Sequence, residues 1–135
     1  MNFVSWVSPR WRGLAGVLLS ALLLGVYARG DLAWMLGFVA LVPWLLAMDG
    51  VRTVRGALAS GLLMSLAFVA AVFVWFGAAI GAYTGIGAGV GTAVLLVLAP
   101  VMQPQIVAFA LVRHLVGRRH GAVLRTLAGA AAWVG

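Results

Sequence analysis

The sequence predicts an all-α fold: a polytopic bundle of transmembrane helices, with four spanning helices and the start of a fifth. The first observation is composition. Of the 135 residues, 65% are hydrophobic and 8% are charged, and the mean hydropathy is +1.17, whereas soluble domains carry about 25% charged residues. The second is that the charges gather in short turns between long apolar runs. The third is the excess of arginine in some of these turns, a pattern typical of membrane topology signals.

Residues 1–12 predict an interfacial N-terminal segment ahead of the membrane domain, which we expect to cover residues 13–135. Trp6 and Trp11 suit the level of the lipid headgroups, because amphipathic rings favour that region, and Arg10 and Arg12 suit water.

The first helix is predicted over residues 13–28. This run is slightly short for the roughly 20 residues that cross a bilayer, but its flanking aromatic residues extend it. A signal peptide is the competing interpretation, because arginines precede the run and Val26-Tyr27-Ala28 resembles a cleavage site. We favour a membrane helix because further apolar runs follow at once.

The second helix is predicted over residues 32–48, after a tight turn at residues 29–31. Pro43 lies inside this run, and a membrane helix tolerates proline because neighbouring groups can satisfy the freed carbonyl. A short polar loop over residues 49–55 follows.

No charged residue occurs from residue 56 to residue 112. A single helix of that length would be roughly 85 Å long, far more than a bilayer, so the chain must reverse. The glycine-rich stretch 81–91 is the expected turn, because glycine weakens helix preference. This gives a third helix over residues 56–80 and a fourth over residues 92–112.

Three residues stand out in the fourth helix. Pro100 and Pro104 are four residues apart and therefore share one face, which predicts a kink near the middle of the membrane. Gln103 lies beside Pro104 in an apolar segment, where a polar side chain commonly has a role. We favour an interhelical hydrogen bond for Gln103 over lining a lipid or substrate cavity.

Four glycines, Gly77, Gly81, Gly85 and Gly89, recur at four-residue spacing. This ladder of small residues predicts close approach between membrane helices. The spacing never gives the G-x-G-x-x-G pattern of a dinucleotide site, and no lysine is present to complete a P-loop.

A basic stretch, consisting of Arg113, His114, Arg118, Arg119, His120 and Arg125, precedes a fifth apolar run over residues 122–135. The ten uncharged residues after Arg125 are too few to cross a bilayer. We therefore expect this fifth helix to be incomplete and the chain to be a truncated piece of a longer protein.

The arginine distribution predicts the orientation. Eight arginines fall on one side of the predicted membrane, and only Arg29 falls on the other. The eight are Arg10, Arg12, Arg52, Arg55, Arg113, Arg118, Arg119 and Arg125. The positive-inside rule then predicts a multi-pass protein of the bacterial inner membrane with a cytoplasmic N-terminus. The sequence pI is about 11.9, but clusters between apolar runs fit membrane orientation better than nucleic-acid binding.

The sequence offers few groups for chemistry. It contains no cysteine, lysine or glutamate, and we expect no cofactor and no metal site. His114 and His120 are six residues apart, which does not place them together on one helix face. A triad of Asp49, His114 and Ser60 is permitted by the predicted topology, but nothing in the sequence requires it.

Several segments resemble the membrane region of bacterial apolipoprotein N-acyltransferases. The resembling residues are Leu36–Ala47 (LGFVALVPWLLA), Arg55, Gly61, Trp75, Pro104, Arg113 and the closing Ala-Ala-Ala-Trp133. The resemblance covers most of this chain but only the first part of a complete family member. One departure is residues 27–34, where the family tends to have a turn rich in proline and phenylalanine.

The resemblance implies a function in lipoprotein maturation. The family transfers an acyl chain from a phospholipid to the amine of a diacylglyceryl-cysteine lipoprotein. Its catalytic Glu, Lys and Cys lie in a later, nitrilase-like periplasmic domain, so no catalytic residue carries over to this sequence. We expect an N-terminal membrane domain that holds membrane phospholipid, is inactive alone, and meets a lipoprotein substrate only when completed by a catalytic domain.

The alternative is a small non-enzymatic membrane subunit, for assembly or transport, that associates through the glycine ladder. A transporter half would favour an inverted internal repeat, and no convincing repeat is present. The sequence does not indicate the oligomeric state.

Overall fold

The computed structural model describes residues 9–117 and 121–134, and within these ranges every regular element is helical. The elements are α1 (Pro9–Ala28), the 3₁₀ helix η2 (Asp31–Phe38), α2 (Val42–Asp49), α3 (Val54–Val72), α4 (Val74–Thr84), α5 (Ala88–Met102), α6 (Pro104–Gly117) and α7 (Ala122–Val134). The all-α fold expected from the sequence is confirmed.

Two helices are long and apolar enough to cross a membrane, over Trp11–Ala28 and Val54–Val72, with mean hydropathies of 1.5 and 1.7. Only 22% and 28% of the residues in these stretches are buried within the protein, so most of their apolar surface faces outward, as membrane helices require. Helices α5 and α6 form a third candidate span if the bent pair is counted as one. The expectation of four spanning helices is not confirmed.

Helix α1 begins at Pro9, four residues before the expected start. Proline suits the first turn of a helix, because its missing N–H would have no partner there and its backbone angle is already helical. Arg10 and Arg12 therefore belong to the first turn of α1. The rest of the expected interfacial segment, residues 1–8, lies outside the described part of the chain.

The helix expected over residues 32–48 is divided into η2 and α2. Residues 39–41 form a turn between them, in which Val39 N–H and Ala40 N–H both donate to the Leu36 carbonyl. Pro43 lies in the first turn of α2, where proline is well tolerated. The prediction that Pro43 lies inside a continuous helix over residues 32–48 is therefore wrong.

The helix expected over residues 56–80 ends early, at Val72, and α4 begins at Val74. Phe73 separates them, with φ −115° and ψ 12°. The surrounding run of β-branched and aromatic residues has low helix preference, and the Phe73 ring packs edge-on against Phe68 at a centroid distance of 5.8 Å. Packing thus stabilises the break, which turns α4 away from α3.

The helix expected over residues 92–112 begins earlier, at Ala88, and is interrupted at Gln103. Pro104 has no N–H to donate and also restricts the residue before it, which explains why α5 ends here and α6 begins. The two helices are bent by 46°. The predicted kink is confirmed at Pro104, as a complete break, whereas Pro100 lies inside α5.

The expected chain reversal within residues 81–91 is also confirmed, and the turn itself is shorter than this glycine-rich stretch. Helix α4 ends at Thr84 and α5 begins at Ala88. Gly85 and Gly87 have φ angles of 73° and 85°, which other residues adopt only with strain. Two of the glycines therefore make the turn itself.

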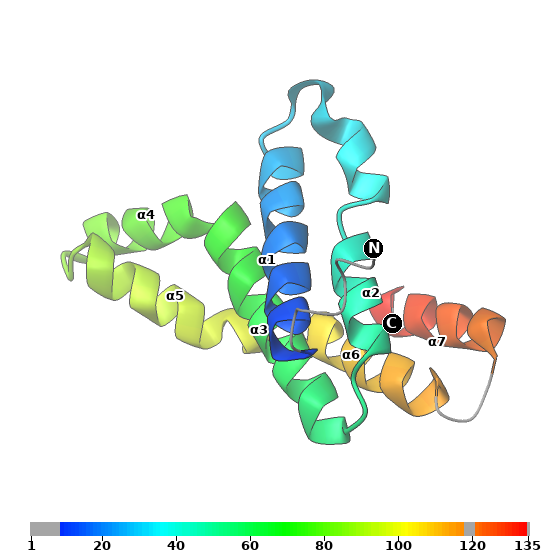
Figure 1. Ribbon diagram of the computed structural model, residues 1–135. Helices are drawn as coiled ribbons and strands as arrows, with labels where there is room; N and C mark the ends of the chain where they lie inside the picture. The colour runs from blue at the N-terminus through cyan, green and yellow to red at the C-terminus, as the bar shows by residue number, and fades with distance from the viewer. Residues whose placement is uncertain (1–8, 118–120, 135) are drawn as a thin grey trace.

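Helices α1 and α3 lie side by side at the centre of the molecule (Figure 1). The α4–α5 hairpin extends from one flank of this pair, and the α6–α7 hairpin extends from the other. Helix α6 packs on α3, and α2 packs mainly on α1. The expected fifth helix is thus present as α7, a 13-residue helix that packs along α6.

The main core surrounds Trp44, which is fully buried. Its cluster contains buried residues from α1, α2, α3 and α6, namely Val17, Trp44, Met48, Met64, Ile106 and Ala110. The Trp44 backbone N–H donates to Ser20 Oγ of α1 at 2.9 Å, and the indole Nε1–H donates to Ser60 Oγ of α3 at 2.9 Å. The ring lies 5.6 Å from the ring of Phe109 on α6. One residue therefore connects four helices.

Replacing Ser60 by alanine leaves the buried indole N–H without its acceptor. We expect Ser60→Ala to lower the free energy of unfolding by about 1 kcal/mol. In the Trp44→Phe background the donor is already absent, so the same serine substitution should cost much less. Thermal unfolding in detergent of the wild type, the two single variants and the double variant completes this double-mutant cycle. An equal cost of Ser60→Ala in both backgrounds would contradict the assignment of this bond.

Candidate functional site

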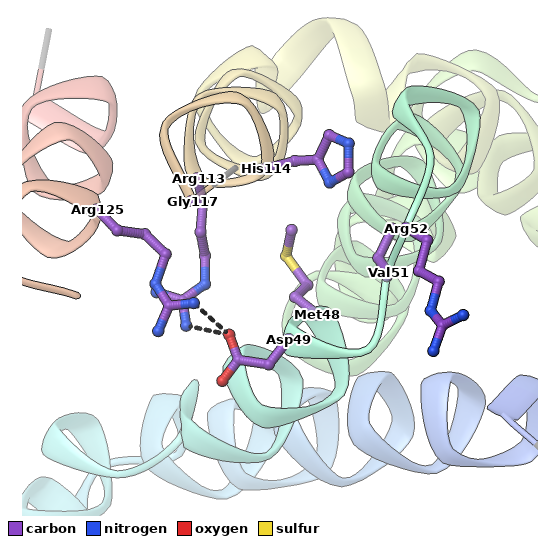
Figure 2. A pocket seen from close by; sticks show the side chains of 8 residues that line it. All are labelled: Met48, Asp49, Val51, Arg52, Arg113, His114, Gly117 and Arg125. Carbon is purple, nitrogen blue, oxygen red and sulfur yellow. Dashed lines mark hydrogen bonds and ion pairs between the residues drawn. The ribbon is translucent and has the colours of Figure 1, made fainter. Parts of the chain in front are cut away.

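A charged pocket lies where the ends of α2 and α6 meet the start of α7 (Figure 2). The cavity has a volume of about 290 Å³. Its lining consists of Met48, Asp49, Val51, Arg52, Arg113, His114, Gly117 and Arg125. These residues come from the end of α2 and the loop after it, and from the basic stretch. The arginine count assigns both segments to the same side of the membrane.

One carboxylate oxygen pairs with two arginines in this pocket. Asp49 Oδ1 accepts a hydrogen bond from Arg113 Nη2 at 2.9 Å and lies 3.2 Å from Arg125 Nη1. The Arg113 side chain is only 12% exposed, whereas those of Arg125 and Asp49 are 30% and 40% exposed. Solvent therefore screens the pairs in part, and their contribution to stability is modest.

The positions of these charges follow from the helix ends. Asp49 is the last residue of α2, where a negative charge is unfavourable beside the partial negative charge of the helix C-terminus. Arg113 lies just before the last turn of α6, which begins at His114. The two arginines thus offset the unfavourable placement of Asp49 and join α2 to the α6–α7 hairpin.

Three buried nitrogen atoms around the pocket have no hydrogen-bond partner in the described part of the chain. They are Arg113 Nε, Arg125 Nε and His114 Nε2. The His114 residue is 7% exposed. Buried polar groups are normally paired, so each of these atoms requires an explanation.

A second cavity, of about 570 Å³, is an apolar groove between α1, α3 and α5. The lining residues are apolar or aromatic: Trp11, Leu14, Ala15, Val17 and Leu18 of α1, Leu63, Leu66, Ala67 and Ala70 of α3, and Leu96 of α5. Two small side chains of α3, Ala67 and Ala70, leave room for the groove, since larger residues at these positions would fill it.

Gln103 and Pro104 line neither of these cavities. Gln103 caps the end of α5, and its Oε1 accepts a hydrogen bond from Gln105 Nε2 at 2.6 Å. The amide pair is thus local to the break between α5 and α6. Pro104 begins α6 and is exposed.

The glycine ladder divides between two roles. Gly77 and Gly81 are buried against α5, where a Cβ on Gly77 would lie 2.7 Å from Thr92 Cα and one on Gly81 would meet the Gly87 carbonyl. Gly85 forms the turn, and a Cβ on Gly89 would meet nothing within 4 Å. The close helix approach is therefore made within the chain, by the α4–α5 hairpin.

The arginines predicted to set topology do not all reach one site. Arg52 and Arg113 line the charged pocket, together with Arg125. Arg12 and Arg55 are exposed, and neither lines the pocket. The structure includes Arg10 in the first turn of α1 but does not describe its side chain, and Arg118 and Arg119 lie outside the described residues.

The structure does not assemble the triad considered from the sequence. Ser60 accepts the hydrogen bond from Trp44 Nε1, and Asp49 pairs with Arg113 and Arg125. No group of three His, Cys, Asp or Glu residues in the described ranges is arranged to hold a metal ion. The apolar groove was missed because no local sequence signal marks a concave surface formed by three separated helices.

Comparison with known proteins gives no match: no family model, curated protein or solved structure is significantly similar to this chain.

Replacing Asp49 by asparagine leaves the partly buried Arg113 and Arg125 without their counter-charge. We expect Asp49→Asn to lower the free energy of unfolding by about 1 kcal/mol at low ionic strength, and by less at high salt, because salt screens exposed charges. Asp31→Asn, which removes the same charge at the start of η2, is the control. Thermal unfolding in detergent at several salt concentrations measures the loss of stability in both variants. A loss independent of salt, or matched by the control, would count against the pairing.

Proposed function

We propose that this chain is a membrane domain that holds a phospholipid, with one acyl chain lying in the apolar groove between α1, α3 and α5. The observation that carries the proposal is the groove itself, which is about 570 Å³ in volume and is lined by apolar and aromatic side chains. Binding cavities for small molecules commonly have volumes of about 300–1,000 Å³ and mostly apolar linings.

The groove lies on the two helices that are long enough to span a membrane, α1 and α3. Between membrane helices there is no hydrophobic driving force, and association depends on packing. An empty groove would lose the dispersion contacts of its lining, so a flexible hydrocarbon chain is the natural occupant in a bilayer. Trp11 lines the groove in the first turn of α1, where an aromatic ring suits the headgroup level.

The sequence resemblance extends this proposal to a reaction. In an apolipoprotein N-acyltransferase, a membrane phospholipid would be the acyl donor, and the acceptor would be the N-terminal diacylglyceryl-cysteine of a lipoprotein. The proposed location is the bacterial inner membrane, with a cytoplasmic N-terminus on the basis of the arginine count. Acyl transfer itself would belong to a separate catalytic domain, since this sequence has no cysteine, lysine or glutamate.

The alternative of an assembly subunit receives less support. It relied on the glycine ladder as an association surface, but Gly77 and Gly81 are buried against α5. Their substitution by leucine would break the α4–α5 hairpin and would not report on association.

Filling the groove should exclude the lipid. Ala70 and Ala79 are both exposed alanines in helices, but only Ala70 lines the groove. We expect Ala70→Leu to reduce labelling of the chain by a phospholipid with a photoactivatable acyl chain at least severalfold, because the added side chain occupies the groove. The labelled peptides, identified by mass spectrometry, should come from α1, α3 and α5.

Ala79→Leu is the matched control and should leave labelling unchanged. Equal labelling of both variants, or labels spread evenly over all outward-facing helices, would show ordinary contact with bulk lipid and would remove the basis of the proposal.

We also expect the chain alone to have no acyltransferase activity. A thioester mechanism needs a thiolate nucleophile and a positioned base, and the sequence contains no cysteine. The assay supplies purified chain, a phospholipid donor and a diacylated lipopeptide, and measures the triacylated product. Product above the level of a heat-inactivated sample would contradict this expectation.

A further inference from the structure

The charged pocket formed by the ends of α2 and α6 and the start of α7 contains an imbalance of charge. Three arginines, Arg52, Arg113 and Arg125, line it with a single carboxylate, Asp49. Arg113 and Arg125 share one oxygen of that carboxylate. One aspartate cannot neutralise both guanidinium groups, and a partly buried charge without a counter-charge is unfavourable.

Nitrogen atoms at the pocket remain unpaired after the ion pairs with Asp49 are counted. Arg113 Nε and Arg125 Nε are buried without partners in the described part of the chain, although one terminal nitrogen of each group pairs with Asp49. Guanidinium groups present parallel N–H donors that match the oxygens of a phosphate. His114 Nε2 is a third buried nitrogen without a partner, on a residue that is 7% exposed.

Arg52, Arg113, His114 and Arg125 all line the same cavity. The cavity is about 290 Å³ in volume. Figure 2 shows the His114 ring and Arg52 on one side of Met48 and the ion-paired Asp49, Arg113 and Arg125 on the other. From the excess of positive charge, the unpaired donors and the cavity together, we infer that this pocket binds a phosphate group.

The phosphate site is independent of the proposed acyl groove, because the two cavities share no lining residue. The phosphate could come from an anionic lipid headgroup or from a free phosphate in the aqueous phase. Basic pockets between membrane helices, on the side where positive charge gathers, are known to bind anionic headgroups. Both sources use the same chemistry.

The experiment uses the full chain, purified in detergent and stripped of lipid, with two probes. Inorganic phosphate is titrated and followed by thermal shift, and phosphatidylglycerol is added and its retention is followed by native mass spectrometry. Diacylglycerol with the same acyl chains is the control ligand, because it lacks the phosphate. Saturable binding of phosphatidylglycerol alone identifies a headgroup site, and binding of inorganic phosphate as well identifies a site open to water.

Arg52 and Arg29 are both exposed arginines, but only Arg52 lines the pocket. We expect Arg52→Gln and Arg113→Gln each to weaken phosphate or phosphatidylglycerol binding about tenfold, the cost of one charge-assisted hydrogen bond. Arg29→Gln should leave binding unchanged, and diacylglycerol retention should be the same in all variants.

If Arg113→Gln does not fold, Arg52→Gln alone tests the inference, because no ion pair joins Arg52 to Asp49 within the described residues. The inference is overturned if neither probe binds saturably, or if Arg29→Gln weakens binding as much as Arg52→Gln.

Discussion

The packing of α1, α2, α3 and α6 depends on the environment of Trp44. The residue is fully buried, its backbone N–H donates to Ser20 of α1, and its indole N–H donates to Ser60 of α3. The first bond satisfies an N–H in the first turn of α2, which has no partner within its own helix. The second satisfies the polar edge of an otherwise apolar ring. Lipid offers these N–H groups no alternative acceptor. Ser20 therefore fixes the position of α1 relative to α2, and Ser60 fixes that of α3.

Small residues around Trp44 permit this arrangement. A Cβ on Gly16 would lie 2.7 Å from the Pro43 carbonyl oxygen, and one on Gly61 would lie 3.1 Å from the Ala110 Cβ. Glycine therefore lets α1 approach α2 and lets α3 approach α6 closely enough for the tryptophan to reach all of them. This approach positions both cavities. The α1–α3 pair forms two walls of the apolar groove, and the seating of α6 on α3 brings Arg113 to Asp49 at the end of α2.

The sequence predicted those features that local chemistry determines. The Gly85–Gly87 turn and the break before Pro104 follow from backbone freedom and from the missing proline N–H. The sequence did not predict the break at Phe73. It also did not predict that the helix expected over residues 32–48 is divided into η2 and α2. Both features depend on packing between distant segments. Of the charged pocket, the sequence predicted only that the loop over residues 49–55 and the basic stretch lie on the same side of the membrane. The pairing of Asp49 with Arg113 and Arg125, and the concave groove, required the positions of separate helices.

The packing of α3 against α6 around Trp44 is tested most directly at the contact between Gly61 and Ala110. The chain contains no cysteine, so a pair introduced as Gly61→Cys and Ala110→Cys reports on one contact. The control pair is Gly61→Cys with Ala108→Cys, because Ala108 is exposed on the same helix. Disulfides need Cβ atoms about 3.5–4.5 Å apart, which the first pair can reach with a small adjustment. Oxidation in native membranes should crosslink the first pair within one chain, detected as a mobility shift that reductant reverses, and should leave the control pair unlinked. Crosslinking of the control pair in place of the first would contradict the packing of α6 on α3 around Trp44.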